Sequence, residues 1–403
     1  MLFKDVIGQA ATKQHLVEMV QQNRLSHALL FLGKEGTGAL PLAMAFAQFI
    51  VCEKVNGKKR ASSPAASLFS EEPDAPAVEL QMDACGICPA CTKAAQMVHP
   101  DIHYSYPAVT RKQGEKPKSS DFIKEFREFF LQNPYGNAYD WLQSINAENK
   151  QGNISAEECN DIIRQLSLKS FESDYKILIM WMPEYLGNEG NKLLKLIEEP
   201  PPNTLFILAA ESEEKILQTI LSRTQLVKIA LLENAEVEQA LITRNETPPD
   251  QAKRVAAIAQ GNYHEAVQLL QHAGEDWLSL ITEWMTCTVR ANKQAEQLKW
   301  IDEVSKLGRE KQKQLLVFFN HLVEQCVRLR IIGADGNLLA GAEKDFAERL
   351  NKITSVTQQQ AIITELDNAT YYIERNANAK MLFHALTIKL HHIIINKVVV
   401  MAA

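Results

Sequence analysis

The sequence predicts an α/β domain with a parallel sheet, followed by a region of helices alone. Four short apolar segments alternate with helical patterns over the first 230 residues, and this alternation is typical of a parallel sheet covered by helices on both faces. Beyond Ala230 the strand pattern stops, and Leu315, Phe318 and Leu322 recur at helical spacing. The four predicted strands are residues 28–32, 176–181, 204–210 and 225–229.

Changes in these patterns divide the 403 residues into three predicted domains. The α/β domain covers residues 1–230, a small domain of short helices covers 231–274, and a larger helical domain covers 275–403. Residues 53–84 and 107–150 are interpreted as insertions, either decoration or partner sites. The first of these combines basic residues, Ser, Pro and acids without an apolar period, which predicts disorder.

Composition restricts the classes of function. The chain has 43 Lys and Arg against 49 Asp and Glu, a formal charge of −6, which argues against a protein that coats DNA by itself. Contact with nucleic acid through one face or through a partner stays open. Residues 1–10 lack the pattern of a signal peptide, and no apolar stretch is long enough to span a bilayer. With seven cysteines, this predicts a cytoplasmic protein whose thiols are free, catalytic or metal-bound.

A glycine-rich turn follows the first predicted strand and precedes a helix. Residues 33–40 read Gly-Lys-Glu-Gly-Thr-Gly-Ala-Leu, which matches the glycines and spacing of a phosphate-binding P-loop. Ala39 stands in place of the lysine that reaches the phosphates, and Leu40 in place of the hydroxyl that binds Mg²⁺. A plain strand-to-helix turn is the alternative. The backbone amides could still cradle an anion, with weak or no nucleotide binding, at Gly33, Gly36 and Gly38.

A second catalytic position is also missing. In a P-loop ATPase, an acid at the end of a neighbouring strand holds Mg²⁺ or orients water. Here the strand 176–181 ends in Trp181 and continues as Met182 and Pro183, so that the first acid is Glu184, beyond the strand. Because two independent positions lack their chemical group, the sequence predicts a P-loop fold without ATP hydrolysis.

Two further segments carry a resemblance to a known family. Residues 193–201, Leu-Leu-Lys-Leu-Ile-Glu-Glu-Pro-Pro, closely resemble a signature of the bacterial clamp-loader AAA+ subunits. Residues 219–224, Thr-Ile-Leu-Ser-Arg-Thr, are similar to the S-R-C segment of that family, with Thr224 in place of the cysteine. These matches occur in the family's order along the α/β domain. Other similar segments are residues 5–9, 26–28 and, more weakly, 376–378.

The resemblance implies an AAA+ domain with a degenerate P-loop at 1–230, a small helical lid at 231–274 and a helical oligomerisation collar at 275–403. It also implies a non-hydrolysing subunit of the DNA polymerase III clamp loader, the complex that places the sliding clamp on primed DNA. The implied partners are gamma/tau-type ATPase subunits and a delta subunit. ATP would be bound by a neighbouring subunit, and Arg223 would act on it in trans as an arginine finger.

Alternatives remain at several of these positions. Arg223 could instead form a surface ion pair. An ATP-hydrolysing gamma/tau-type subunit is the alternative function, but it requires a lysine at position 39 and an acid near 181. The family's sensor positions also look lost, since only Ser212 could supply the first sensor's hydroxyl. The second sensor has His264 where active relatives carry arginine, and a histidine there is more often structural.

A cysteine cluster predicts structural zinc in an inserted segment at about 52–99. Three cysteines in the pattern C-x₂-C-x₂-C are typical of tetrahedral thiolate sites, with free buried thiols as the alternative. A fourth ligand is needed: the resemblance favours Cys52, and His99 is the other candidate. A zinc-containing nucleic-acid-binding module is disfavoured by the net charge, and the basic run 58–60 is short. The three clustered cysteines are Cys85, Cys88 and Cys91.

Overall fold

The computed structural model describes residues 1–55, 81–111, 116–147, 150–271, 276–290, 294–332, 341–374 and 377–398. These residues form two compact units, 1–265 and 266–403, and each is described by itself. Most of segment 53–84, including the basic run 58–60, and Asn376 lie outside the described residues. The disorder predicted for that segment therefore stays a prediction, as does the division into three domains.

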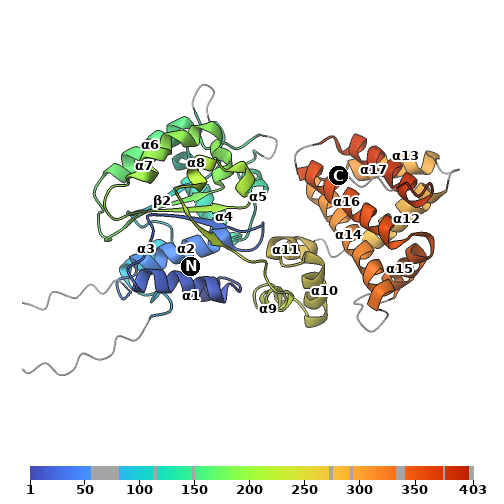
Figure 1. Cartoon of the computed structure of the whole chain (residues 1–403), viewed down its shortest axis with the longest axis horizontal. Coiled ribbons are helices and arrows are strands. Elements are labelled where there is room, and N and C mark those ends of the chain that lie inside the picture. The colour runs from blue at the N-terminus through green and yellow to red at the C-terminus, as the bar shows by residue number, and fades with distance from the viewer. Residues whose placement is uncertain are drawn as a thin grey trace, which may run out of the picture. The chain divides into compact units, whose positions relative to one another are not determined.

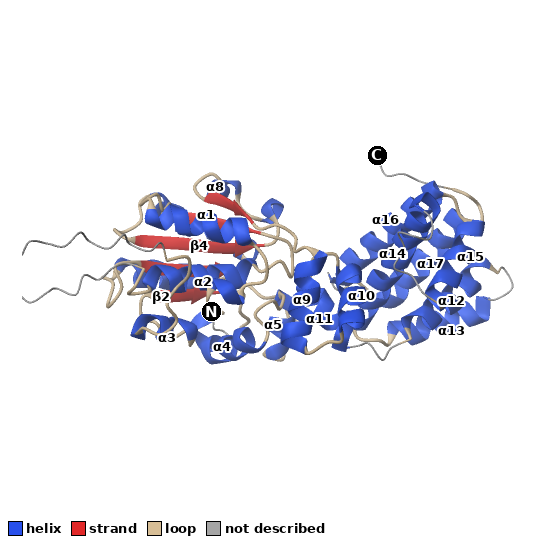
Figure 2. Cartoon of the chain, turned by 90° about the horizontal axis from the view of Figure 1, so that it is seen from below, coloured by secondary structure: helices blue, strands red, loops and turns tan. Residues whose placement is uncertain are grey.

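A five-stranded parallel sheet forms the centre of the first unit (Figures 1 and 2). The strand order is β2-β3-β4-β1-β5, and every neighbouring pair is parallel. The predicted class, a parallel α/β sheet followed by helices alone, is confirmed. The strands are β1 (Ala28–Leu32), β2 (Ile102–Ser105), β3 (Lys176–Trp181), β4 (Thr204–Ala210) and β5 (Gln225–Lys228).

Side chains of the strands alternate between two apolar cores, as the two-residue period of a strand requires. Phe31 and Ile207 belong to one core, whereas Leu30 and Phe206 belong to the other. The first core is covered by α1 (Ala10–Gln21), α2 (Ala39–Val51), α3 (Pro89–Ala95), α4 (Ile123–Gln132) and α5 (Ala138–Ser144). The second is covered by α6 (Ala156–Ser167), α7 (Leu194–Glu198), α8 (Gln218–Leu221) and the 3₁₀ segment Pro183–Leu193. Figure 1 shows α1, α2 and α3 below the sheet and α6, α7 and α8 above it.

The described part of segment 107–150 belongs to the core and is not a surface addition. The ring of Tyr106, just before it, stacks on Phe126 with centroids 3.7 Å apart, and Trp141 packs edge-on at 5.3 Å from Tyr106. Trp141 is fully buried, and its indole N–H donates to the carbonyl oxygen of Pro107 at 2.6 Å. The described part of this segment thus has a structural role, because its aromatic rings complete one face of the sheet, and whether it is also a partner site stays open.

Helix α6 begins after Ser155, which caps its first turn, and the side chain of Glu158 in that turn has a partner outside the helix. The hydroxyl of Ser155 accepts the N–H of Glu158 at 3.2 Å, as an N-cap does. The Glu158 carboxylate, however, accepts the N–H of Ser119 at 2.9 Å. Glu158 therefore fixes the approach to α4, so the S-x-x-E pattern marks a helix start and a long-range contact together.

Three short helices complete the first unit and lead out of it. Helix α9 (Asn234–Asn245) packs on α10 (Pro249–Ala259), and α11 (Tyr263–Gln271) begins within the first unit. In the second unit the described elements are all helices, centred on the stacked rings of Trp284 and Trp300 with centroids 4.5 Å apart. They are α12 (Trp277–Val289), α13 (Gln294–Ser305), α14 (Arg309–Ile332), α15 (Ala342–Ile353), α16 (Val356–Glu374) and α17 (Ala379–Ile394). Among the described residues, no helix is long and apolar enough to cross a membrane.

Candidate functional site

The glycine loop between β1 and α2 keeps the backbone form of a strand–loop–helix turn. Gly36 has a φ of 71° and Gly38 a φ of 96°, a region that favours glycine. Space also requires glycine there. A Cβ at Gly36 would lie 1.8 Å from Oδ1 of Asn262, and one at Gly38 would lie 3.0 Å from the ring of Tyr135. Parts of the chain distant in sequence therefore reach into the loop.

The pocket beside this loop lacks the lysine, the hydroxyl and the acid of a P-loop ATPase. Leu40 is buried in the core, and Trp181, at the end of β3, is only 4% exposed. The Trp181 ring lies 5.9 Å from that of Phe129, so an aromatic side chain fills the place of a magnesium-binding acid. Together with the loop glycines, Trp181 and Tyr135 line a cavity of 30 Å³, room for roughly one or two water molecules.

The start of α11 closes the loop from the other side. The N–H of Tyr263 donates to the carbonyl oxygen of Gly36 at 3.2 Å. Next to it, His264 is 2% exposed, with Nδ1 2.9 Å from Oε1 of Glu35 and Nε2 2.6 Å from Oδ2 of Asp140. Burial opposes a charge on the imidazole, but the two carboxylates together outweigh it and raise the pKa of His264 to about 10. The two carboxylates on either side of the ring thus favour the charged form of His264.

Sequence reasoning identified His264 as structural but missed its two partners. Glu35 lies within the glycine loop and Asp140 in the first turn of α5. Both look like ordinary surface acids in the sequence, since neither belongs to a spacing pattern that suggests a buried charge. The only signal was indirect: Asn137 and Asp140 form a capping box, which fixes where that carboxylate points.

Arg223 follows α8 and forms an ion pair within the chain. Its Nη2 lies 2.6 Å from Oε1 of Glu198, and its Nη1 donates to the carbonyl oxygen of Thr219 at 2.9 Å. The side chains of Arg223 and Glu198 are 30% and 50% exposed. The ion pair expected from the surface interpretation is present, and the arginine finger stays a prediction. The contact also joins the two segments, 193–201 and 219–224, that carry the family resemblance.

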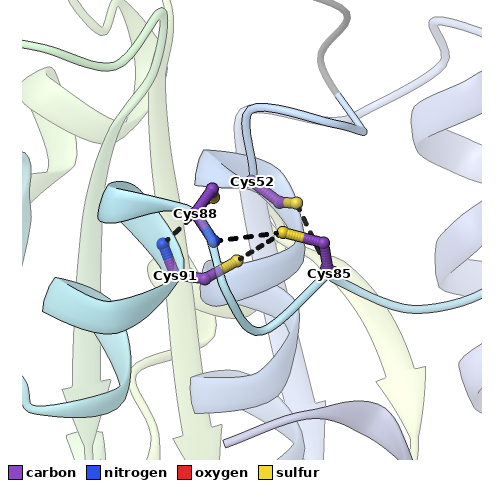
Figure 3. Close-up of side chains that lie close together, drawn as sticks. All are labelled: Cys52, Cys85, Cys88 and Cys91. Atoms are coloured by element: carbon purple, nitrogen blue, oxygen red, sulfur yellow. Dashed lines mark hydrogen bonds between the residues drawn. The ribbon is translucent and has the colours of Figure 1, made fainter.

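Four cysteine side chains converge beside the end of α2. Cys52 follows that helix, Cys85 and Cys88 lie in a tight loop, and Cys91 lies in α3 (Figure 3). All four sulfur atoms lie within 4.8 Å of one another. Backbone N–H groups point at three of them: that of Cys85 donates to Cys52 Sγ at 3.3 Å, and those of Cys88 and Cys91 donate to Cys85 and Cys88 at 3.4 Å.

This arrangement fits a structural zinc ion. Tetrahedral zinc with Zn–S bonds of about 2.3 Å places its sulfur ligands roughly 3.8 Å apart, close to the separations in the cluster. The backbone N–H groups that donate to Cys52, Cys85 and Cys88 favour the thiolate form that zinc binds. The chain brings Cys52 to the triplet across 32 intervening residues. His99 lies elsewhere, with Nε2 3.4 Å from Oε1 of Glu172 and Nδ1 accepting the N–H of Asp101.

Comparison with known proteins agrees with these features. The sequence model of a family described as "DNA polymerase III, delta subunit" matches residues 8–78 and 56–233. The Bacillus subtilis DNA polymerase III subunit delta' is 26% identical over 255 residues, which are 63% of this chain and 56% of that protein. The Haemophilus influenzae subunit tau/gamma is 23% identical over 277 residues, 67% of this chain and 30% of that protein. A solved gamma subunit-related protein of Thermotoga maritima is 13% identical, with a TM-score of 0.34 over 93% of this chain and 98% of its own.

The chain therefore spans about half the length of the first relative and less of the second. The family match covers more than half of this chain. It includes the glycine loop, the cysteine cluster and both segments joined by Glu198 and Arg223. The chain belongs to the DNA polymerase III delta subunit family of clamp-loader proteins.

Proposed function

We propose that this chain is the non-hydrolysing, delta prime type subunit of a DNA polymerase III clamp loader. It has no catalytic activity of its own and binds no ATP productively. It completes the ATP site of a neighbouring gamma/tau-type subunit and so supports ATP-dependent loading of the sliding clamp onto primed DNA. The whole complex serves a DNA-directed DNA polymerase, in the cytoplasm at the replisome.

The observation that carries this proposal is the state of the glycine loop. The lysine and hydroxyl positions are Ala39 and Leu40, and Trp181 lies at the magnesium position. A P-loop without these groups loses the charge that stabilises the transferred phosphoryl group. The cavity beside the loop is small, about 30 Å³, and Trp181 and Tyr135 line it. The missing chemical groups, together with these aromatic side chains, therefore support a chain that does not hydrolyse ATP.

The other proposed roles follow from the same function. Arg223 is the arginine finger that acts on ATP bound next door, because a planar guanidinium can bind two phosphate oxygens at once. The proposed partners are gamma/tau-type ATPase subunits, a delta subunit and, through the complex, the clamp and primed DNA. Zinc, held by the four cysteines, is structural, and residues 275–403 form the oligomerisation collar.

An ATP-hydrolysing gamma/tau-type subunit is the second candidate, and one observation favours keeping it. The Bacillus subtilis subunit tau is 26% identical over 281 residues, which equals the identity to the delta' subunit of that organism. Overall identity therefore does not separate the two types. The side chains at positions 39, 40 and 181 support the non-hydrolysing type, because they lack the groups that ATP hydrolysis needs.

Two measurements test the proposal. Titration calorimetry of the purified chain with Mg-ATP should show no binding at nucleotide concentrations that saturate a gamma/tau-type subunit measured in parallel. Reconstitution with gamma/tau-type and delta subunits should give a complex whose clamp-stimulated ATP turnover requires this chain. ATP turnover by the purified chain alone would support the second candidate, and a fully active loader without this chain would contradict the proposal.

A further inference from the structure

We propose that Glu35, Asp140 and His264 form a charge latch that replaces a bound nucleotide, holding the glycine loop, α5 and the start of α11 together in one closed arrangement. The inference goes beyond the proposed function because it concerns this chain alone and would hold in any assembly. Its three residues lie more than a hundred positions apart in the sequence, on three separate elements.

The hydrogen bonds of the latch specify a charged histidine by geometry. Both ring nitrogens of His264 face carboxylate oxygens, at 2.9 Å for Glu35 and 2.6 Å for Asp140. A neutral imidazole has one N–H and one lone pair, so it could donate to only one of these carboxylates and would repel the other. With both carboxylates ionised, the imidazolium, which donates from both nitrogens, is the form that satisfies both partners.

All three side chains of the latch are largely buried, so that loss of the positive charge on His264 would destabilise the fold. The side chains of Glu35 and Asp140 are 22% and 12% exposed, and that of His264 is 2% exposed. The side-chain amide of Asn137, in front of α5, also donates to Oε1 of Glu35 at 3.2 Å. Removing one member of a buried set of opposite charges leaves the others without their counter-charge, which is strongly destabilising.

The latch acts directly on the glycine loop. Asn262 and Tyr263, the two residues before His264, press on Gly36: the first blocks the space of a Cβ there, and the second donates its N–H to the Gly36 carbonyl oxygen. The loop also carries Glu35 itself. Opening the loop therefore requires separating His264 from Glu35, so the strength of the ion contacts controls access to the pocket.

Among the described residues, the hydrogen-bonding groups that face the latch come from the loop, which contributes Glu35, and from α5, which contributes Asp140 with the amide of Asn137 in front of it. The guanidinium of Arg244 on α9 lies over the ring of Tyr135, 5.9 Å from its centroid. Because His264 has a folded-state pKa of about 10 against an ordinary value of 6.5, its stabilisation of the fold is complete below pH 6.5 and is lost as the pH rises through 10.

Hydrogen–deuterium exchange of the full chain tests the latch with His264→Gln, which keeps a polar side chain but cannot carry the charge. We expect amides in the glycine loop and around residues 262–265 to exchange at least tenfold faster, whereas amides of β3 and β4 keep their protection. The matched control is His103→Gln, a histidine on β2 outside the latch, which should leave the loop unchanged. Unchanged exchange of the loop in His264→Gln overturns the proposal.

Two additional measurements keep the test decisive. The difference in melting temperature between the wild type and His264→Gln should shrink between pH 6 and pH 10.5, whereas a difference that stays constant contradicts a charge latch and indicates packing alone. If His264→Gln does not fold, Glu35→Gln and Asp140→Asn replace it. Each should increase exchange of the loop, and the double variant should show less than the product of the two single effects; multiplicative effects overturn the latch.

Discussion

Nη2 of Arg223 lies 2.6 Å from Oε1 of Glu198, and this ion pair joins the two segments in which the chain most resembles clamp-loader subunits. Both side chains are partly exposed, so water and salt screen their attraction, and pairs of this kind contribute about 1 kcal/mol or less. The pair can therefore orient the guanidinium near the surface without preventing it from leaving for a phosphate. This is the behaviour that an arginine acting on a neighbouring subunit requires.

The first prediction concerns Arg223→Ala. Removing the guanidinium should leave the melting temperature within about 2 °C of the wild type, since exposed pairs add little stability. Turnover at the neighbouring ATP site of the reconstituted loader should fall by about a thousandfold, which is the lower end of the usual effect of losing an arginine finger. Arg164→Ala, another surface arginine with an acidic partner, is the control. Clamp- and DNA-stimulated turnover that matches the wild type would be evidence against the role.

Restoring the missing P-loop groups should not restore nucleotide binding. In the double variant Ala39→Lys, Leu40→Thr the lysine and hydroxyl are present, but Tyr135 and Trp181 still leave only the small cavity beside the loop. We expect no ATP binding in a fluorescence titration with a nucleotide analogue. Micromolar affinity in this variant would show instead that the missing lysine and hydroxyl, and not a lack of space, prevent the wild type from binding ATP.

The cysteine cluster predicts one tightly held metal ion per chain. Elemental analysis of reduced protein should give close to one zinc, and Cys88→Ser should lower both the zinc content and the melting temperature, the latter by several degrees. Structural zinc contributes to folding because its site does not exist in the unfolded chain. Cys287→Ser, a buried cysteine of α12 outside the cluster, should keep its zinc. An unchanged zinc content in Cys88→Ser would contradict the predicted set of ligands.

The second unit exposes an apolar stripe along α17 that fits the proposed collar. Met381 and Ile388, seven residues apart, are both exposed, and Ile395 continues the same spacing just beyond the helix. A seven-residue apolar repeat is typical of a helix that packs on another helix. Ile388→Lys should leave the chain folded but weaken its assembly with gamma/tau-type subunits by about tenfold or more. Ile353→Lys, at the end of α15, is the control; equal assembly of both variants would place the interface elsewhere.

The sheet could be predicted from sequence because three of its central strands are continuous apolar runs, buried on both faces. Strand β2 could not, since it has four residues, includes polar His103 and Ser105, and lies at the edge of the sheet. Strand β5 is one residue shorter than predicted, ending at Lys228. Local apolar patterns thus predict central strands, whereas an edge strand such as β2 forms through its hydrogen bonds to the neighbouring strand, which its own sequence does not show.

The candidate sites also differ in how far the sequence predicts them, depending on whether their residues are close together in the chain. The spacing of Cys85, Cys88 and Cys91 is local, so the sequence alone pointed to a metal, but the approach of Cys52 depends on where α2 ends. The partners of His264 could not be predicted at all. Glu35 and Asp140 become buried counter-charges only because the fold brings the loop, α5 and α11 together, and no pattern in the sequence records that contact.

The last prediction concerns Asp101, which ties the segment before β3 to the start of β2. Its carboxylate accepts three backbone N–H groups, from Phe171, Glu172 and Ser173, the last two at 2.8 and 2.7 Å. Burial acts to raise the pKa of Asp101, but these hydrogen bonds outweigh it and the pKa is lowered. The resulting stabilisation is therefore present above the ordinary value of 3.8 and is lost as the pH falls through the lowered folded-state pKa.

Asp101→Asn should reduce the free energy of unfolding by about 2–3 kcal/mol at pH 7, because a neutral amide replaces a carboxylate that accepts charge-assisted hydrogen bonds. Urea unfolding followed by circular dichroism measures this loss. Asp174→Asn changes an exposed acid in the same segment and should cost less than about 0.5 kcal/mol. Equal stability of the two variants at pH 7 would show that hydrogen bonds from the three N–H groups to water are as favourable as those to the carboxylate of Asp101. If the carboxylate is the cause, the difference in the free energy of unfolding between the two variants should shrink as the pH falls through the lowered folded-state pKa of Asp101.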